Sequence, residues 1–387
     1  MENHRIPSIR FKGFSDAWEQ RKLEEIYSFK YGEFNNNPDN GGQYPIYGAN
    51  GIIGGFDRFN TENSIIIGHM GEYAGSVIYE KNKHFVTYNG TITTKKDKTS
   101  INYYDFYLLS SIGINKICNS SGLPFLSYDK LNEIKVYDTG NQLEMNKIGL
   151  MLSSIDNIIT LHQRKCQVLI NTKKALLEKM FPSEHEAMPK IRFKGFSDAW
   201  EQRKYADIGT CFSGGTLSYS SLSNNGKYNC VLYGDLYTLY DTTILNVERR
   251  TNYKGNTIFQ NDILFPQSTT VDAYSLISPA CLNVKTAETS GVFVIRPNKN
   301  VDGNFIAYYS KGNEKQRNKL AKNAQGLTIV HLYYQSIKDE TIKIPSLNEQ
   351  TKISTLLIEL VCLITLHQRK CEKLKNMKKS LLEKMFI

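Results

Sequence analysis

The sequence predicts an α+β protein, in which two mostly-β globular domains are separated by two long α-helices that form an antiparallel coiled coil. Three observations lead to this fold class. Two blocks of sequence each occur twice, one of these blocks has the apolar spacing of a coiled coil, and the segments between the blocks have the composition of short strands and turns. At 387 residues the chain is long enough for two or three domains with cores of their own.

The two repeated blocks alternate along the chain. The A block reads PSIRFKGFSDAWEQRK at residues 7–22 and PKIRFKGFSDAWEQRK at residues 189–204, with one difference at its second position. The B block covers residues 158–181 and 363–386, which are identical at 18 of 24 positions. The inserts between A and B show little visible similarity. A fixed frame around two dissimilar inserts indicates a pseudo-twofold tandem repeat. Such a repeat would recognise two different targets with one architecture.

The B blocks and the residues before them form a heptad seam. Mostly apolar residues recur at alternating spacings of four and three over more than four heptads in each copy, which predicts a coiled coil. Each helix would have about 33 residues and a length of about 50 Å. The seam residues of the first helix are Ile148, Leu152, Ile155, Ile159, His162, Cys166, Leu169 and Leu176, and those of the second are Ile353, Leu357, Leu360, Ile364, His367, Cys371, Leu374 and Leu381.

Two features of this seam leave alternatives open. The module symmetry favours an antiparallel helix pair, but the sequence by itself also permits a parallel pair. His162 and His367 interrupt the apolar seam at equivalent positions, either as polar residues that fix the register or as a metal or proton site. The seven cysteines include no CxxC pair, so we expect neither a disulfide framework nor a metal site.

The inserts, residues 23–141 and 205–346, are rich in Tyr, Asn, Gly, Ser and Thr and predict mostly β structure, with short helices near residues 103–112 and 305–309. Their Gly-rich segments permit close backbone approach to a ligand, and Asn and Tyr can read or stack on bases; tight β-turns are the alternative interpretation. The candidate base-contacting residues are Tyr47, Asn50, His69 and Tyr73 in the first insert and Thr216, Gln267, Ser268, Thr269 and Gln325 in the second.

The chain is basic, with a formal charge of +10 and a pI near 9.0. This balance favours a polyanionic partner, nucleic acid before a membrane surface, although lysine-rich solvated surface is the alternative. The candidate phosphate-contacting residues are Lys95, Lys96 and Lys98 in the first insert and Lys311, Arg317, Lys319 and Lys322 in the second.

No catalytic motif is found in the sequence. It lacks a Walker A loop, a GxGxxG fingerprint, a GxSxG elbow, an HExxH pair and the motif of amino-methylating enzymes. We therefore predict no catalytic residues. The sequence has no uninterrupted run of about 18 apolar residues and no signal peptide pattern, so we expect a cytoplasmic protein without a membrane partner.

The chain resembles the specificity subunit of type I restriction–modification systems over essentially its whole length. The residues that carry the resemblance are the segment IPSLNEQTKI at 344–353, with the family's Pro-x-x-x-Glu-Gln-x-x-Ile helix start, the loop YGANG at 47–51, and the entries to the inserts at Trp18, Leu23, Ile26, Trp200 and Ile208. The first helix start departs from this pattern, since it has no proline and has Met145 where Gln350 stands.

The resemblance implies two target recognition domains, at residues 1–141 and 183–346, each reading one half of a split DNA sequence. Coiled-coil helices at residues 142–182 and 347–387 would set the unread spacer. The implied partners are double-stranded DNA, two methylation subunits and the restriction/translocation subunits. The partners would methylate adenine and cleave DNA with ATP, so S-adenosylmethionine, ATP and Mg belong to them and no cofactor is expected in this chain.

Two other function classes remain to be separated from this one. A self-sufficient DNA methyltransferase would bind the methyl donor, but its motifs are absent. A coiled-coil scaffold with two β-rich binding domains would show no salt-dependent binding to duplex DNA, whereas a DNA-specificity subunit should.

Overall fold

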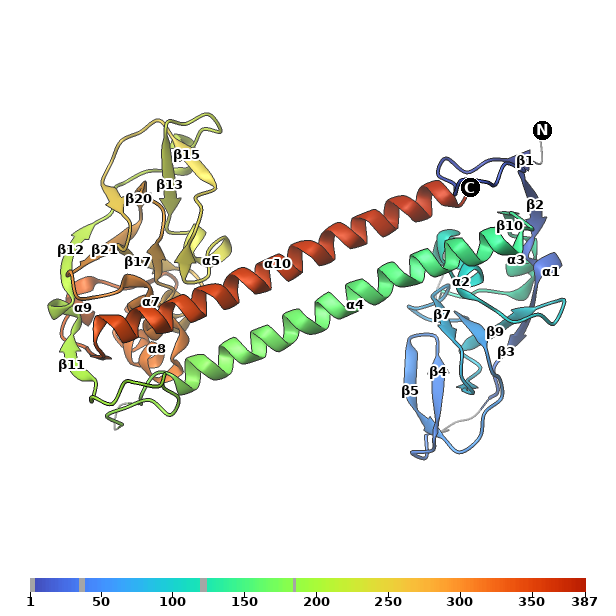
Figure 1. The fold of residues 1–387 in the computed structure, drawn as a ribbon, viewed down its shortest axis with the longest axis horizontal. Helices are drawn as coiled ribbons and strands as arrows, with labels where there is room; N and C mark the ends of the chain where they lie inside the picture. Colours follow the sequence, from blue (N-terminus) through green and yellow to red (C-terminus); the bar gives the residue numbers. More distant parts are fainter. Residues whose placement is uncertain (1–3, 35–38, 119–123, 184–185) are drawn as a thin grey trace. The chain divides into compact units, whose positions relative to one another are not determined.

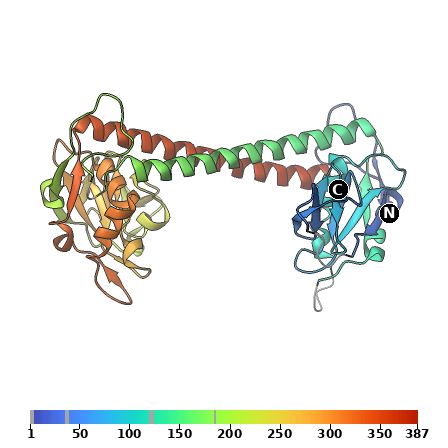
Figure 2. The same cartoon turned by 90° about the horizontal axis from the view of Figure 1, so that it is seen from below.

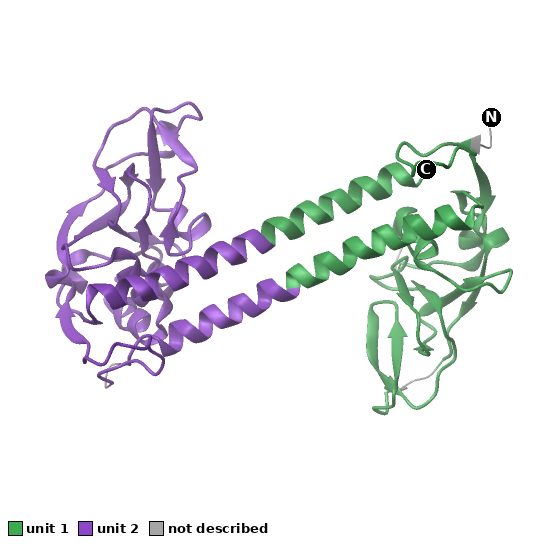
Figure 3. Cartoon of the chain, in the orientation of Figure 1, with its two compact units in different colours: residues 1–163, 368–387 green, residues 164–367 purple. Residues whose placement is uncertain are grey.

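The computed structural model describes residues 4–34, 39–118, 124–183 and 186–387, which belong to two compact units (Figure 3). Unit 1 comprises Met1–Gln163 and Gln368–Ile387, and unit 2 comprises Arg164–His367. The first insert lies in unit 1 and the second in unit 2, and each of the two long helices contributes residues to both units (Figure 3).

The two long helices are α4, Gln142–Lys179, and α10, Leu347–Met385. At 38 and 39 residues they are longer than the heptad seam predicts. Helix α4 begins before its first seam residue because the side chain of Asn141 caps it. Asn141 Oδ1 accepts hydrogen bonds from the backbone N–H groups of Leu143 (3.0 Å) and Glu144 (3.2 Å).

The helices pair in opposite directions within each unit, as both Figure 1 and Figure 2 show. In unit 1 the Cys371 thiol donates to the carbonyl of Ile159 (3.7 Å), and about two turns further along α10 Lys378 pairs with Asp156 (2.7 Å). Residue numbers therefore rise along α10 as they fall along α4. This confirms the antiparallel pair and excludes the parallel one.

The predicted seam residues are shielded from solvent. None of the sixteen, all of which lie in the described part of the chain, is exposed. Several of the buried residues also pack on the inserts, and so do the half-buried Leu169, Leu176 and Leu381. The buried residues are Ile148, Leu152, Ile155, Ile159, Ile353, Leu357, Leu360 and Cys371; the half-buried residues are His162, Cys166, Leu169, Leu176, Ile364, His367, Leu374 and Leu381.

Unit 1 holds three small sheets and short helices. The sheets have the strand orders β1-β2-β10, β3-β9-β6-β7 and β5-β4-β8. The strands are β1 His4–Arg5, β2 Trp18–Lys22, β3 Tyr27–Tyr31, β4 Tyr44–Gly48, β5 Gly51–Phe56, β6 Ser64–Gly68, β7 Val77–Glu80, β8 Phe85–Val86, β9 Gly90–Lys95 and β10 Lys135–Asp138. The helices are α1 Leu23–Ile26, α2 Tyr103–Ser111, η1 Ile114–Lys116 and α3 Tyr128–Glu133.

Unit 2 holds the sheets β11-β23, β12-β21-β17-β19-β14, β15-β13-β20-β16 and β18-β22. The strands are β11 Glu201–Lys204, β12 Gly209–Ser213, β13 Tyr228–Leu232, β14 Thr243–Ile244, β15 Arg249–Thr251, β16 Thr257–Phe259, β17 Ile263–Pro266, β18 Ser268–Thr269, β19 Ala280–Leu282, β20 Thr286–Ser290, β21 Val292–Pro297, β22 Val330–His331 and β23 Thr341–Ile344. The helices are η2 Tyr205–Asp207, η3 Tyr219–Ser221, α5 Asp235–Thr238, α6 Ala273–Leu276, α7 Gly303–Gly312, α8 Glu314–Ala321 and α9 Tyr334–Ile337.

The two inserts share one topology despite their dissimilar sequences. Sheet β3-β9-β6-β7 corresponds to β12-β21-β17-β19, and the parallel pair β4-β8 corresponds to β13-β20. The second insert adds β14, β16 and α8. The predicted helices near residues 103–112 and 305–309 are confirmed as α2 and α7. Both lie in their unit's main core together with the central strand of the sheet and a long helix.

Among the described helices, α10 is the one that is long and apolar enough to cross a membrane by length and composition. Its residues Ile353, Leu357 and Leu360 are buried in the core of unit 2, and Cys371 is buried against α4 in unit 1. Helix pairing and core packing therefore account for part of its apolar composition, while Leu363 and Leu366 are exposed.

Candidate nucleic-acid interface

The A block of each unit joins the start of one long helix to the end of the other. In unit 1 the guanidinium of Arg10 donates two hydrogen bonds to the carboxylate of Glu144 in the first turn of α4 (2.6 and 2.8 Å). The backbone N–H of Ile9 donates to the carbonyl of Lys384 in the last turn of α10 (3.1 Å). One short segment therefore fixes both helix ends against the first insert.

The second A block repeats these contacts in unit 2. Arg192 donates two hydrogen bonds to Glu349 at the start of α10 (2.6 and 2.7 Å). The N–H of Ile191 donates to the carbonyl of Lys179 at the end of α4 (2.9 Å). The near-identity of the A blocks is thus explained by a common task, which is to hold each insert on the helix pair with the same geometry.

The tryptophans of the A blocks complete this frame. Trp18 is fully buried and lies edge-on to Phe386 with ring centroids 6.2 Å apart. Trp200 meets Phe181 in the same way, at 6.5 Å. Phe386 and Phe181 are the last residues of the two B blocks, so each insert is closed by the A block and the end of a B block.

The departure of the first helix start from the family pattern has a structural reason. Gln350 is buried; its side-chain carbonyl accepts from the N–H of Asp302 (2.9 Å) and its amide donates to the Pro345 carbonyl (2.8 Å). It thereby holds the start of α7. In unit 1 the start of α2 is satisfied by its own capping box, Asn102 with Asp105, and Met145 packs in the core instead.

The hairpin β4–β5 presents one of the predicted base-contacting residues and hides another. Asn50, at its tip, is exposed, as is Tyr73 in the loop after β6. Tyr47 is buried (5 % exposed), and its hydroxyl donates to Glu80 Oε2 (2.7 Å). Burial, with that hydrogen bond, raises the pKa of Tyr47. Tyr47 supports the hairpin from inside and does not present its hydroxyl to a ligand.

His69 is also inside the first insert, not on its surface. It is 6 % exposed; Nδ1 lies 3.0 Å from the Leu126 carbonyl, and its ring lies against Tyr31 (3.9 Å) and Phe125 (4.7 Å). Burial lowers the pKa of His69. The imidazole of His69 packs within an aromatic cluster whose exposed member is Phe125.

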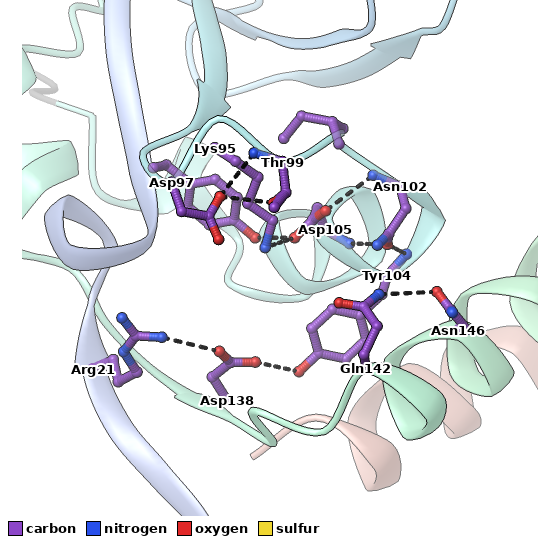
Figure 4. Close-up of polar contacts among 12 residues, drawn as sticks. Arg21, Lys95, Asp97, Thr99, Asn102, Tyr104, Asp105, Asp138, Gln142 and Asn146 are labelled. Atoms are coloured by element: carbon purple, nitrogen blue, oxygen red, sulfur yellow. Dashed lines mark hydrogen bonds and ion pairs between the residues drawn. The ribbon is translucent and has the colours of Figure 1, made fainter.

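The three predicted lysines of the first insert divide into two kinds. Lys95 Nζ lies 2.6 Å from Asp105 Oδ1 in the interior, as Figure 4 shows, so it is not available to a phosphate. Lys96 and Lys98 are exposed. The ammonium of Lys96 donates to the carbonyl of Glu24 (2.9 Å), at a surface that a phosphate could also reach.

The structure brings four of the predicted residues of the second insert to one cavity of about 640 Å³. Ser268 and Thr269 line it from β18, Lys311 from the end of α7 and Arg317 from α8. The sequence did not single out the other residues that line it. These include Tyr233, Tyr237, Val271, Ser275 and Ile329.

The two cations of this cavity are held in place by neighbours. Lys311 Nζ lies 3.5 Å from Asp241 Oδ1, and burial lowers its pKa in spite of that carboxylate. The guanidinium of Arg317 lies over the ring of Tyr274 (3.9 Å), and its Nε donates to the Tyr274 carbonyl (3.0 Å). Both positive groups are therefore fixed at the cavity instead of moving freely in solvent.

The remaining candidates of the second insert differ in exposure. Thr216, Lys322 and Gln325 are exposed. Lys319 is engaged within the unit, since its ammonium donates to Thr341 Oγ1 (2.8 Å) and lies 3.2 Å from Glu340. Gln267 is half-buried and contributes backbone hydrogen bonds (3.2 and 3.0 Å).

Candidate segments of the two inserts occupy the same place in the fold. Each follows the central strand of its sheet, β6 or β17, and pairs with the segment that precedes α3 or α9. In unit 1 the bridge is Met70 to Phe125, and in unit 2 it is strand β18 to β22. The sequence carried no signal of this correspondence, because the paired residues differ in type.

The polar groups of the described residues include no cluster of three His, Cys, Asp or Glu side chains that could hold a metal ion. His162 and His367 are half-buried in the helix pair.

Comparisons with known proteins agree with this arrangement. A family model described as the type I restriction modification DNA specificity domain matches residues 15–171 and 197–376. The chain is 22% identical over 369 residues to the specificity subunit of the type I restriction enzyme MjaVIII from Methanocaldococcus jannaschii, covering 88% of this chain and 84% of that protein. It is 25% identical over 344 residues to a putative MjaX specificity subunit from the same organism, covering 84% and 76%.

The fold also has a counterpart among solved structures. The S subunit of a type I restriction–modification system from M. genitalium aligns with a TM-score of 0.71 at 16% identity, covering 98% of this chain and 99% of that one. The likeness shows a shared fold over the whole chain.

Proposed function

Since the chain belongs to the family of type I restriction–modification DNA specificity proteins, we propose that each of its inserts reads one half of a bipartite DNA target. The observation that carries this proposal is that the A-block contacts with the long helices are the same in both units, whereas the exposed residues of the two inserts differ. The same two clamps, Arg10 on Glu144 and Arg192 on Glu349, hold inserts of one topology whose exposed residues differ. One architecture thereby presents two different readers.

Direct contacts to DNA would come from the exposed members of the candidate set. Asn50 and Tyr73 in the first insert and Gln325 in the second are exposed and offer hydrogen-bonding groups for base edges. The half-buried Ser268 offers its hydroxyl group at the cavity. Arg317, fixed on Tyr274, can donate from its terminal nitrogens. The phosphate contacts would come from lysines on the surface, namely Lys96, Lys98 and Lys322.

The chain itself would be the non-catalytic member of a cytoplasmic complex. Methylation of adenine and ATP-dependent restriction would be carried out by partner subunits, which would supply S-adenosylmethionine, ATP and Mg. An adenine inside a duplex must leave the stack before it is methylated, and the inserts would hold the DNA while a partner does this.

Two equivalent surfaces on the long helices suit two copies of one methylation subunit. In the first copy Ile158 and Leu161 are exposed on α4, and their repeat equivalents Leu363 and Leu366 are exposed on α10. Exposed apolar side chains at equivalent positions are typical of interaction sites when charged residues flank them, as Arg164 and Arg369 do here. Two like sites predict two like partners.

Methylome mapping tests the proposal in cells that carry the complex with and without this chain. We expect methylated adenines in one bipartite sequence only when the chain is present. Replacing residues 205–346 with the insert of another family member should then change one half-site, and the matched replacement of residues 23–141 should change the other. Methylation independent of the chain, or a change in both half-sites from one replacement, contradicts the proposal.

A further inference from the structure

One loop of the second insert exposes a leucine completely. Leu327 lies between α8 and β22 and is 101 % exposed, and Ile329 in the same loop is 48 % exposed. Gly326 before it has φ +114°, and a Cβ there would lie 2.1 Å from the Ile329 carbonyl, so only glycine permits this tight bend. The bend turns the side chain of Leu327 into solvent at a cost in hydration that no contact within the chain offsets.

The loop is pinned at its base. The N–H of Gln325 donates to the His331 carbonyl (2.9 Å), and the N–H of His331 donates to the Gln325 carbonyl (2.7 Å). The strand that follows, β22, pairs with β18 through Ser268↔His331 and Thr269↔Val330. Leu327 therefore lies on a short loop whose two ends are tied together by hydrogen bonds, unlike an apolar residue on a frayed surface.

The surroundings of the loop indicate its ligand. Ile329 lines the cavity that also holds Lys311 and Arg317. Val271, 70 % exposed, extends the apolar surface from the loop after β18. An apolar tip beside fixed cations and hydroxyl groups matches a polyanion with an apolar interior, which is the character of duplex DNA.

We propose that Leu327 is a wedge that inserts between two base pairs of the half-site read by the second insert. Arg317 at the cavity would hold an adjacent phosphate while the leucine separates the stacked bases. Sequence preference would then arise partly from the cost of opening that step, which is lowest at flexible pyrimidine–purine steps. The inference rests on the proposed function.

The first insert carries the same pair of residue types at the corresponding place in the chain. Gly122-Leu123 precedes α3 as Gly326-Leu327 precedes α9, although the two inserts are otherwise dissimilar. Residues 122 and 123 lie outside the described residues, and the proposal concerns the second insert alone.

The test uses the full chain in complex with its methylation subunits, on a duplex with the target found by methylome mapping. The probe is 2-aminopurine, which fluoresces when it is unstacked, placed at successive positions of each half-site except the adenine that is methylated, because flipping of that base would give a rise of its own. We expect a rise at one step of the second half-site with the parent complex and with Leu327→Met. Leu327→Ala should abolish the rise and weaken specific binding about tenfold or more. Leu245→Ala, at another exposed leucine of unit 2, is the control and should leave both unchanged.

Four results would overturn the wedge. The first is a fluorescence rise that persists in Leu327→Ala. The second is weaker binding by Leu327→Ala although the parent complex shows no fluorescence rise, which would make the leucine a groove contact. Leu327→Ala could instead prevent assembly with the methylation subunits, measured by light scattering, which would make the loop a protein dock. A parent complex that does not prefer the target duplex removes the proposed function itself and the wedge with it, and this outcome is separate from the other three.

Discussion

Arg10 and Glu144 form a two-hydrogen-bond ion pair (2.6 and 2.8 Å) across 134 residues of sequence, with both side chains almost fully buried. Burial by itself would raise the pKa of Glu144. Hydrogen bonds from Arg10 and Thr139 outweigh that effect and hold the pKa of this carboxyl below its usual value. The pair therefore stays ionised over the physiological pH range and links the A block to the first turn of α4.

Removing one charge of this pair should destabilise unit 1 strongly. Glu144→Gln keeps the shape of the side chain but leaves the buried guanidinium of Arg10 without its carboxylate, and we expect a loss of about 3 kcal/mol in the free energy of unfolding. Glu349→Gln should have a similar effect through Arg192 in unit 2. Urea denaturation of the full chain measures both, and Glu62→Gln at an exposed site is the control. A change as small as that of the control would show that the pair contributes little.

The A blocks and the two long helices could be predicted from the sequence because each of these elements occurs twice in it. The recurrence of the B block and its heptads predicted the two helices and their seam residues. Asn141 lengthened α4 by capping it nearly two turns before Ile148, the first seam residue. The contact of Arg10 with Glu144 could have been suspected, since Arg192 and Glu349 recur at equivalent positions. The shared topology of the inserts could not, because different apolar residues satisfy the same strand pattern.

The candidate site was less predictable because residue type says little about burial. Tyr47 and His69 were chosen as groups that can read bases, but both support the insert from inside. Lys95 lies on the same face of β9 as Thr91 and Thr93, which are buried although they are polar, so the sequence carried no signal of its burial. The cavity in unit 2 is lined by segments that lie far apart in the chain, so no local sequence pattern predicts it.

Acidification should destabilise the first insert through its two buried histidines. Burial lowers the pKa of both His69 and His84. As the pH falls below about 6.5, the unfolded chain takes up these protons before the folded one, so the stability present above that pH is lost on the way down to the folded pKa values.

The denaturation midpoint of the full chain, measured from about pH 7.5 to about pH 5.5, should therefore fall for the parent protein. The double variant of His69→Gln and His84→Gln, which has no imidazole to protonate at these sites, should show a flatter dependence over the same range. An equal slope in the parent and the double variant would assign the pH dependence to other groups.

A carboxylate placed on either exposed helix surface should remove one methylation subunit. Leu161→Glu and Leu366→Glu each put a charge at the centre of a surface that would be desolvated on docking, and we expect binding at that site about 100-fold weaker. Light scattering of the assembled complex should give one methylation subunit for either variant and none for the double variant. Gln163→Glu and Gln368→Glu add the same charge at exposed equivalent positions two residues away and should retain both subunits. Full assembly of the double variant would place the docking surface elsewhere.

The chain should tolerate circular permutation without a linker. Ile191 bonds to Lys179 and Ile9 bonds to Lys384 through the same backbone contact (2.9 and 3.1 Å). Twelve residue steps separate Lys179 from Ile191, and joining Ile387 directly to Met1 would place the same twelve steps between Lys384 and Ile9. The permuted chain can begin at Met188, just before the second A block. Its new ends then interrupt the connection from Lys179 to Ile191, and the joined ends form the equivalent connection from Lys384 to Ile9.

We expect this permutant to fold with a free energy of unfolding within about 1 kcal/mol of the parent, since the frame contacts are kept and new chain ends at a surface connection are well tolerated. Urea denaturation gives the stability, and methylome mapping of cells that carry the permutant should return the parent target sequence. As a control, the same chain opened between Ile92 and Thr93, inside β9, should fail to fold because it breaks a central strand. A permutant opened at Met188 that is as unstable as this control would show that the two connections are not equivalent, and that the repeated frame does more at one end of the helix pair than at the other.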